Sequence, residues 1–275
     1  MKKHSVKNVR FSLVPQFREA LRYISESKRF IYAIVVLFFV GALFGFLLHN
    51  YLGVLDSILR SLVDQTKGLF GFDLIAFIFR NNMEASLFSI LYGFFLGVFP
   101  LLSSLGNGIV LGYVAQKAQI ASGFITLWRL LPHGIFELPA VLISLGLGMR
   151  LGLGFFELSF SRYKRNRFRL FVVLLSVIAS LFGAFLILLG LGGLFELASG
   201  VTSSLLLSSL SALLFGGALV YPLFMFLFGD AALRKEQSKD FLRRLWSSLH
   251  VFFYIVLPLL AIAAIIEGLL IFFVK

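Results

Sequence analysis

Three ionisable side chains lie inside strongly apolar stretches of this sequence: His133, Glu137 and Glu267. His133 and Glu137 belong to the segment LPHGIFELPA and are four residues apart, so on a helix both project from one face and can contact each other. Glu267 lies in the segment AAIIEGLL. An ionisable residue at the centre of a membrane helix costs about 2.5–3.5 kcal/mol, so each of the three indicates a function or a specific partner.

Two prolines flank the His133–Glu137 pair. Pro132 stands where a helix is expected to begin, and a missing N–H loses no hydrogen bond there. Pro139 stands inside the helix, where it should bend the chain and leave the carbonyl of Ile135 partly free. One turn would then present an imidazole, a carboxyl group and a carbonyl oxygen, which together suit a cation, a proton or a polar headgroup.

Two amides extend this candidate site. We expect Asn82 at the outer end of a span, beside Glu84, and Asn107 near the inner end of another. Asn107 would join the others only if its span were re-entrant. The predicted polar cluster therefore comprises His133, Glu137, Glu267, Asn82 and Asn107.

The cluster admits a ligand site or an interhelical clamp, in which a neutral histidine and glutamate fix the register of two helices. One histidine and two glutamates form a thin ligand set for zinc, so neither a metal nor a cofactor is assigned. Hydrolysis needs a base, a water and a stabilising donor within reach, which these residues do not establish, so no catalytic residue is assigned.

The composition identifies the class of protein that holds these residues. Hydrophobic residues make up 59% of the 275 residues and charged residues only 14%, with a mean hydropathy of +0.97. Soluble domains average about 25% charged residues, so we expect a polytopic membrane protein. The net charge of +12 comes from Lys and Arg that flank apolar runs, which indicates anionic lipid headgroups rather than nucleic acid. The absence of cysteine excludes thiol chemistry and disulfides.

The apolar runs predict an all-α, polytopic transmembrane helix bundle with amphipathic surface helices. About seven spans are expected, at 30–48, 84–103, 105–121, 130–149, 170–192, 205–228 and 251–274, with a tight turn near Ser104. Residues 1–29 form a cytoplasmic amphipathic N-terminal segment, and residues 30–275 form the transmembrane domain. Further surface helices are expected at 54–64 outside and at 230–246 inside.

The distribution of basic residues predicts the orientation. With the N-terminus inside, the segments 1–29, 150–169 and 229–250 are cytoplasmic and hold nineteen of the 25 Lys and Arg residues. Under the positive-inside rule, this places the chain in the cell membrane with its N-terminus cytoplasmic and its C-terminus external. Glycine pairs at four-residue spacing, such as Gly41/Gly45 and Gly108/Gly112, are typical of ordinary packing between membrane helices, and they are also compatible with a homo-oligomer.

Four motifs together resemble the stage II sporulation protein M family: IFRNN, GNGIVLGY, LPHGIFELPAVLISLGLGMRLG and AAIIEG. The resemblance covers roughly residues 79–268, and PHGIFELPA is its most specific part. It implies an integral membrane protein, found in bacteria and archaea, whose sporulating members anchor peptidoglycan-degrading partners during engulfment and have no established catalytic role. The matching positions are Asn82, Asn107, Gly108, Pro132, His133, Gly134, Glu137, Pro139 and Glu267. The long N-terminal helix and the extra length around the last spans depart from the family pattern and point to a generic relative.

These features lead to one preferred function and two alternatives. The preferred function is a non-enzymatic multi-pass scaffold for membrane or cell-envelope remodelling complexes, with the lipid bilayer and envelope-remodelling proteins as partners. The first alternative is a permease or channel-like protein in which Glu137 and Glu267 line a polar path. The second is an intramembrane hydrolase.

Overall fold

The structure, a computed structural model, describes residues 13–66, 68–69, 71–94, 97–123, 131–163 and 231–273. All regular elements in these ranges are helical, in agreement with the predicted class. They comprise α1 (Leu13–Leu47), η1 (His49–Tyr51), α2 (Val54–Thr66), α3 (Phe72–Leu91), η2 (Tyr92–Phe94), α4 (Val98–Ser122), α5 (Leu131–Tyr163), α8 (Ala231–Val251), η4 (Phe252–Val256) and α9 (Leu257–Phe273).

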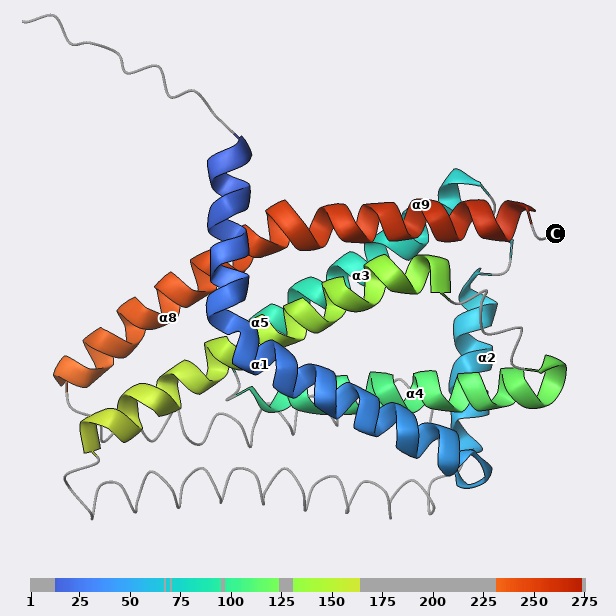
Figure 1. The fold of residues 1–275 in the computed structure, drawn as a ribbon, viewed down its shortest axis with the longest axis horizontal. Coiled ribbons are helices and arrows are strands. Elements are labelled where there is room, and N and C mark those ends of the chain that lie inside the picture. The colour runs from blue at the N-terminus through green and yellow to red at the C-terminus, as the bar shows by residue number, and fades with distance from the viewer. Residues whose placement is uncertain are drawn as a thin grey trace, which may run out of the picture.

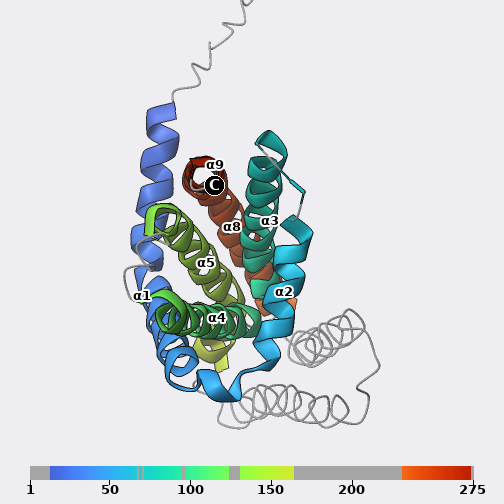
Figure 2. The same ribbon diagram turned by 90° about the vertical axis from the view of Figure 1, so that its right-hand side faces the viewer.

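Helix α5 lies at the centre of the described bundle, and α1, α3, α4 and α9 surround it (Figure 2). Its middle section is fully buried, with Leu145 and Leu147 at 0% exposure. Glycines alternate with these leucines and let neighbouring backbones approach closely: a side chain at Gly146 would meet the backbone of Ile31 in α1. Because α5 carries the LPHGIFELPA segment at its start, this central helix positions the predicted site.

Helices α1 and α4 run in the same direction and are locked together by two glycine pairs. Gly41 and Gly45 of α1 face the backbone of Leu105 and Ile109, while Gly108 and Gly112 of α4 face that of Phe38 and Ala42. A Cβ at any of these four glycines would overlap backbone atoms of the other helix. The small-residue pairs found in the sequence are therefore used for packing within the chain.

The connection between α3 and α4 differs from the prediction. The expected turn near Ser104 is wrong: Ser104 is fully buried inside α4 and donates a hydrogen bond to the Ile34 carbonyl of α1 at 2.8 Å. The helix α4 instead begins at Val98, directly after Gly97, which has a left-handed φ of 70° and caps the helix. Pro100 then falls in the first turn of α4, where its missing N–H loses nothing.

This shift moves the boundaries of the second and third predicted spans. The second was expected at 84–103, but its helix is α3, which begins at Phe72 and ends at Leu91. The third was expected at 105–121, and α4 begins earlier, at Val98. The sequence from Leu87 to Leu105 is apolar and contains no charged residue that marks the turn. Hydropathy alone therefore predicts the wrong boundary between the second and third spans.

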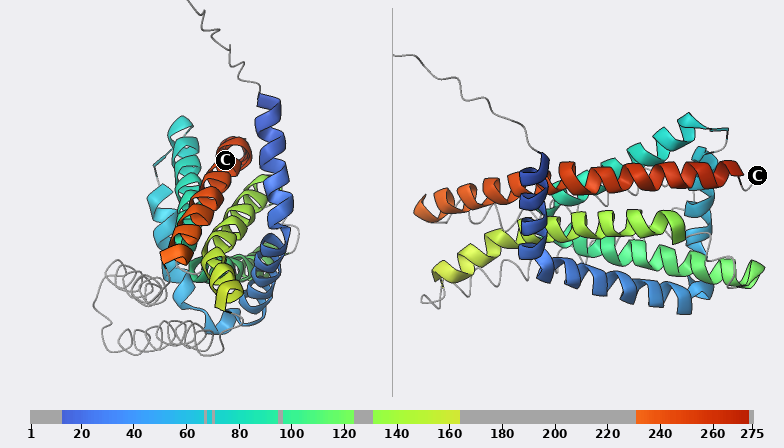
Figure 3. Two further views of the ribbon diagram at one scale, coloured as in Figure 1. Left: turned by 90° about the vertical axis from the view of Figure 1, so that its left-hand side faces the viewer. Right: turned by 45° about the horizontal axis from the view of Figure 1, so that its top comes forward.

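The N-terminal helix and the C-terminal helices pack together where α1 meets α8. Helix α1 continues without a break across residues 29 and 30, and its first half crosses the long rod formed by α8, η4 and α9 (Figures 1 and 3). The surface helix predicted at 230–246 is thus the start of the last apolar helix rather than a separate element. The predicted amphipathic segment packs on it through Ala20, which is fully buried in a cluster with Val251 and Phe252.

Four stretches of the described chain are long and apolar enough to cross a membrane: Val14–Leu47, Phe72–Leu91, Gly134–Gly154 and Lys235–Leu270. They correspond to the predicted first, second, fourth and seventh spans. The number of about seven is not confirmed, since the spans expected at 170–192 and 205–228 lie outside the described residues. Helix α2 lies across one end of the bundle, where it crosses the direction of α4 and α9 (Figure 1).

Candidate functional site

Glu137 and Glu267 lie on two neighbouring helices, and α3 packs against both of these helices. Gly148 of α5 contacts Ser89 of α3, and α3 and α5 run in the same direction. Glu137 lies about three turns before Gly148, which brings it to the level of residue 78 of α3. Gly268, the residue after Glu267, contacts Ile75 of α3. The two glutamates are therefore within about one helical turn of each other in height.

Both carboxyl side chains in this layer are half-buried. Glu137 is engaged in an interaction within the chain. Helix α5 begins at Leu131, so Pro132 stands in its first turn, as expected, and the helix continues through Pro139. The side chains of residues 131–133, that of His133 included, lie outside the described residues.

Asn82 and Glu84 lie nearer the middle of their helix, α3, than predicted. Asn82, expected at the outer end of a span, stands at the middle of α3 because this helix begins at Phe72, and its side chain is half-buried. Arg80 and Glu84 flank it and form an ion pair of 3.1 Å on the exposed side. Helix α3 thus carries an amide and a paired arginine and glutamate at mid-length, where charged groups in a membrane helix need a partner.

Asn107 does not share this arrangement. It stands about two and a half turns into α4, rather than near its end, because α4 begins at Val98. Its side chain is exposed, and its amide nitrogen donates to the carbonyl of Ser103 at 2.8 Å and to the Ser103 hydroxyl at 3.2 Å. Its described hydrogen bonds therefore stay within its own helix.

A second polar site, which the sequence did not reveal, joins α1, α5 and α8 at the opposite end of the bundle. The Arg150 guanidinium lies over the Tyr23 ring at 4.2 Å from its centre and donates to the Ser27 hydroxyl at 2.7 Å. The Tyr23 hydroxyl donates to the carbonyl of Arg244 in α8 at 3.3 Å. Arg244 in turn donates to the Arg150 carbonyl at 3.1 Å, which closes a triangle of contacts between three helices.

Acidic groups balance the charges of this triangle. Asp240 accepts from Arg244 at 2.6 Å and is also paired with Arg243. Glu26 lies 3.5 Å from Arg150. We name the set of Tyr23, Ser27, Arg150, Asp240 and Arg244 the three-helix junction. The side chains of its two arginines are largely shielded from water, since Arg150 is 16% exposed and Arg244 is 13% exposed. The hydrogen bonds of the junction are therefore protected from water.

A family model for the stage II sporulation protein M matches residues 34–197 of the chain, which is more than half of its length. The chain belongs to this family. With its apolar helices, it is a membrane protein. No curated protein and no solved structure matches it.

In this stage II sporulation protein M homologue, the family match covers some of the described helices and leaves others outside. It begins earlier than the motifs predicted, within the apolar half of α1, and includes α3, α4 and the LPHGIFELPA segment of α5. It ends before α8 and α9, so Glu267 lies outside it, as do Tyr23 and Ser27. Within the three-helix junction, only Arg150 lies in the matched range.

The homologue also has a polar contact at the end of the bundle near Glu267. Tyr113 of α4 donates a hydrogen bond to Asp56 of α2 at 2.6 Å, and the Lys117 ammonium lies 3.4 Å from the other carboxylate oxygen. The Tyr113 hydroxyl, and after it Lys117, lowers the pKa of Asp56 below its ordinary value of 3.8. We name this contact the α2 clasp, because it fastens the amphipathic helix to the bundle.

Metal binding finds no support in the described part of this homologue. Within it, no group of three His, Cys, Asp or Glu side chains is arranged to hold a metal ion. The predicted helix clamp, in which polar groups fix the register of neighbouring helices, stays a prediction.

Proposed function

We propose that this family member is a non-enzymatic, multi-pass scaffold for membrane or cell-envelope remodelling complexes. The observation that carries the proposal is the backbone-to-backbone locking of the central helices. Gly45 and Gly112 join α1 to α4, and Gly93 of η2 joins the α3–α4 turn to Gly148 of α5. Backbones in direct contact leave little room for one helix to slide or rotate against the other, so this packing supports a fixed platform over helices that rock around a transported solute.

The platform holds a surface element at each of its two ends. The α2 clasp fastens α2 at one end, and the three-helix junction fixes α8 at the other. Helix α8 exposes Lys239, Leu242 and Arg243. A basic face with an apolar residue suits contact with anionic headgroups and with a protein partner at the membrane surface.

The proposed orientation puts the three-helix junction in the cytoplasm. Arg150, Arg243 and Arg244 gather at this end of the bundle, together with Lys28 and Arg29 at the middle of α1. Under the positive-inside rule, this end is cytoplasmic, and the α2 clasp and the C-terminus are external.

The test is the size of the complex that the chain forms in its native membrane, measured on native gels after mild detergent extraction. A scaffold migrates well above its own mass of 30.8 kDa plus detergent, and Leu242→Asp releases its partners. Glu236→Gln, on the same helix, is the matched control and leaves the complex unchanged. Glu137→Gln also leaves it unchanged.

The permease alternative makes the opposite prediction for Glu137. If Glu137→Gln preserves folding and complex size but abolishes a solute flux in proteoliposomes, the scaffold proposal fails.

A further inference from the structure

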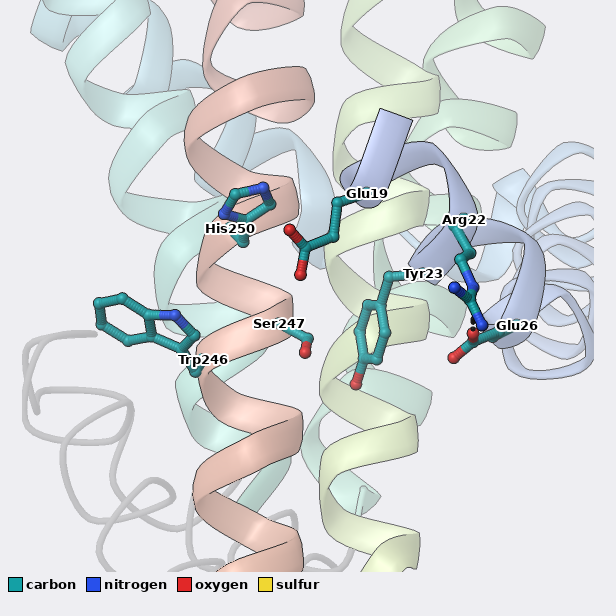
Figure 4. A pocket seen from close by; sticks show the side chains of 7 residues that line it. All are labelled: Glu19, Arg22, Tyr23, Glu26, Trp246, Ser247 and His250. Carbon is teal, nitrogen blue, oxygen red and sulfur yellow. Dashed lines mark ion pairs between the residues drawn. The ribbon is translucent and has the colours of Figure 1, made fainter. Parts of the chain in front are cut away.

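A small polar cavity lies between the first half of α1 and the end of α8. Its volume is about 180 Å³, and it is lined by Glu19, Arg22, Tyr23, Glu26, Trp246, Ser247 and His250 (Figure 4). Sites for drug-sized ligands measure about 300–1,000 Å³, so this cavity suits a smaller group. It opens beside the three-helix junction, whose Tyr23 forms part of its wall.

The lining holds two carboxylates, Glu19 and Glu26, together with the Arg22 guanidinium and the His250 imidazole. Glu26 is paired with Arg22 at 3.3 Å and lies 3.5 Å from Arg150. Glu19 extends from α1 toward α8, between His250 and Tyr23 (Figure 4). In the described part of the chain, no ion pair or hydrogen bond engages the Glu19 carboxylate. The cavity therefore offers a carboxylate for a cationic group, with the Arg22 guanidinium nearby for an anionic one.

The surroundings place the cavity at the boundary between the membrane and water. An exposed apolar stripe runs along α8 and η4 past its rim, formed by Leu242 at 60%, Trp246 at 75% and Phe253 at 59% exposure. Ile262, Ile265 and Leu269 of α9 are exposed as well, and Lys235–Leu270 is long and apolar enough to cross a membrane, so exposed apolar side chains of this rod suit contact with lipid. Tryptophan is enriched at the headgroup level of membranes, which fits the position of Trp246 at the rim.

An irregular helical segment lies directly beside the cavity. His250 contacts the Gln16 carbonyl of α1 through its Nε2 at 3.0 Å and lies 4.6 Å from the Tyr254 ring, measured between ring centres. Tyr254 belongs to η4, a π-helix of five residues. Segments of this kind are rare and are often found at functional sites.

We propose that this cavity binds the headgroup of a zwitterionic aminophospholipid of the phosphatidylethanolamine type. The primary ammonium contacts Glu19, the phosphate lies toward Arg22, and the acyl chains follow the stripe of Leu242, Trp246 and Phe253. Continuity with the lipid-facing stripe favours a lipid over a soluble ligand. The Glu19 carboxylate, which extends toward α8 without an ion pair, disfavours a purely anionic headgroup. The inference goes beyond the scaffold proposal and does not depend on it.

Competition between lipids tests the inference on the full chain. The protein is placed in nanodiscs with equal amounts of phosphatidylethanolamine and phosphatidylglycerol, and the lipids that it retains after release into detergent are counted by native mass spectrometry. We expect phosphatidylethanolamine to be retained preferentially. Loss of one exposed charge contact changes a binding affinity by at most about fivefold. Glu19→Gln should therefore reduce the ratio of retained phosphatidylethanolamine to phosphatidylglycerol by up to about that factor.

The controls separate the cavity from general lipid contact. Glu236→Gln removes an exposed carboxylate from α8 outside the cavity and should leave the preference unchanged. Glu19→Lys should shift retention toward phosphatidylglycerol, and an unchanged thermal unfolding temperature shows that each variant is folded. Equal retention of both lipids by the native chain, or equal effects of Glu19→Gln and Glu236→Gln, would overturn the proposal. Displacement of the lipid by an equal concentration of soluble glycerophosphoethanolamine would overturn the lipid as occupant.

Discussion

The guanidinium carbon of Arg150 lies 4.2 Å from the centre of the Tyr23 ring, although 127 residues separate the two in the sequence. The same guanidinium donates to Ser27 and to the Tyr23 carbonyl. Arg150 therefore binds both the backbone and the side chains of α1, and it links the amphipathic half of that helix to the centre of the bundle.

We expect Arg150→Lys to lower the free energy of unfolding by about 1–3 kcal/mol, because lysine cannot reproduce the fork of donors or the stacking over the ring. Thermal or denaturant unfolding in detergent micelles measures this change. Arg18→Lys, at an exposed position of the same helix α1, is the matched control and should change stability little. Equal stability of the native chain and Arg150→Lys would show that the junction is not a structural link.

The packing of α1 on α4 predicts opposite effects on stability for alanine substitutions at two glycines of α4. A Cβ at Gly112 would overlap the Ala42 carbonyl, whereas nothing lies within 4 Å of a Cβ at Gly106. Gly112→Ala should destabilise the protein by about 1–3 kcal/mol through overpacking. Gly106→Ala should be neutral or stabilise by up to about 1 kcal/mol, because alanine favours the helix. Similar unfolding temperatures for both variants would contradict the predicted helix contact.

The α2 clasp predicts a dependence of stability on acid. Because the folded pKa of Asp56 is below its ordinary value of 3.8, the clasp contributes fully at pH values above 3.8 and is lost as the pH falls through the folded pKa. Tyr113→Phe removes the main donor and raises the folded pKa, so it should reduce the loss of stability between neutral pH and about pH 3. Unfolding temperatures measured across this range check the effect, and identical pH profiles for the native chain and Tyr113→Phe would exclude the clasp.

The absence of cysteine from the chain permits a direct test of orientation. Asn50→Cys in η1 and Lys239→Cys in α8 are both exposed and lie toward opposite ends of the bundle. In intact cells, a membrane-impermeant maleimide should label Asn50→Cys alone, and Lys239→Cys should react only after the membrane is opened. The reverse pattern would place the N-terminus outside.

Sequence reasoning succeeded where composition or local chemistry decides the structure. The helical class, the start of α5 near Pro132 and the apolar half of α1 follow from hydropathy and proline chemistry. The turn between α3 and α4 was missed because it lies within an uninterrupted apolar run and depends on the left-handed conformation of Gly97. The spacing of Gly93, Gly97 and Pro100 was the available signal, but glycine pairs at this spacing also serve packing.

The candidate site was predictable only in part. Glu137 and Glu267 could be selected from their own sequence surroundings, since each is an isolated acid in an apolar helix. The depth of Asn82 could not, because it depends on where α3 begins. In the sequence, Arg150 resembles the other basic residues that flank the predicted spans, and only its contact with Tyr23 distinguishes it.

The most direct test of the fixed-platform proposal is the access of water to the layer of Glu137 and Glu267. Each glutamate is replaced singly by cysteine, and its reaction with a charged, water-soluble thiol reagent is measured from both sides of the native membrane, with Asn50→Cys as the reactive control. We expect Asn50→Cys to react rapidly and neither Glu137→Cys nor Glu267→Cys to react from either side. Rapid modification of both Glu137→Cys and Glu267→Cys would contradict the scaffold and establish a polar path through the bundle.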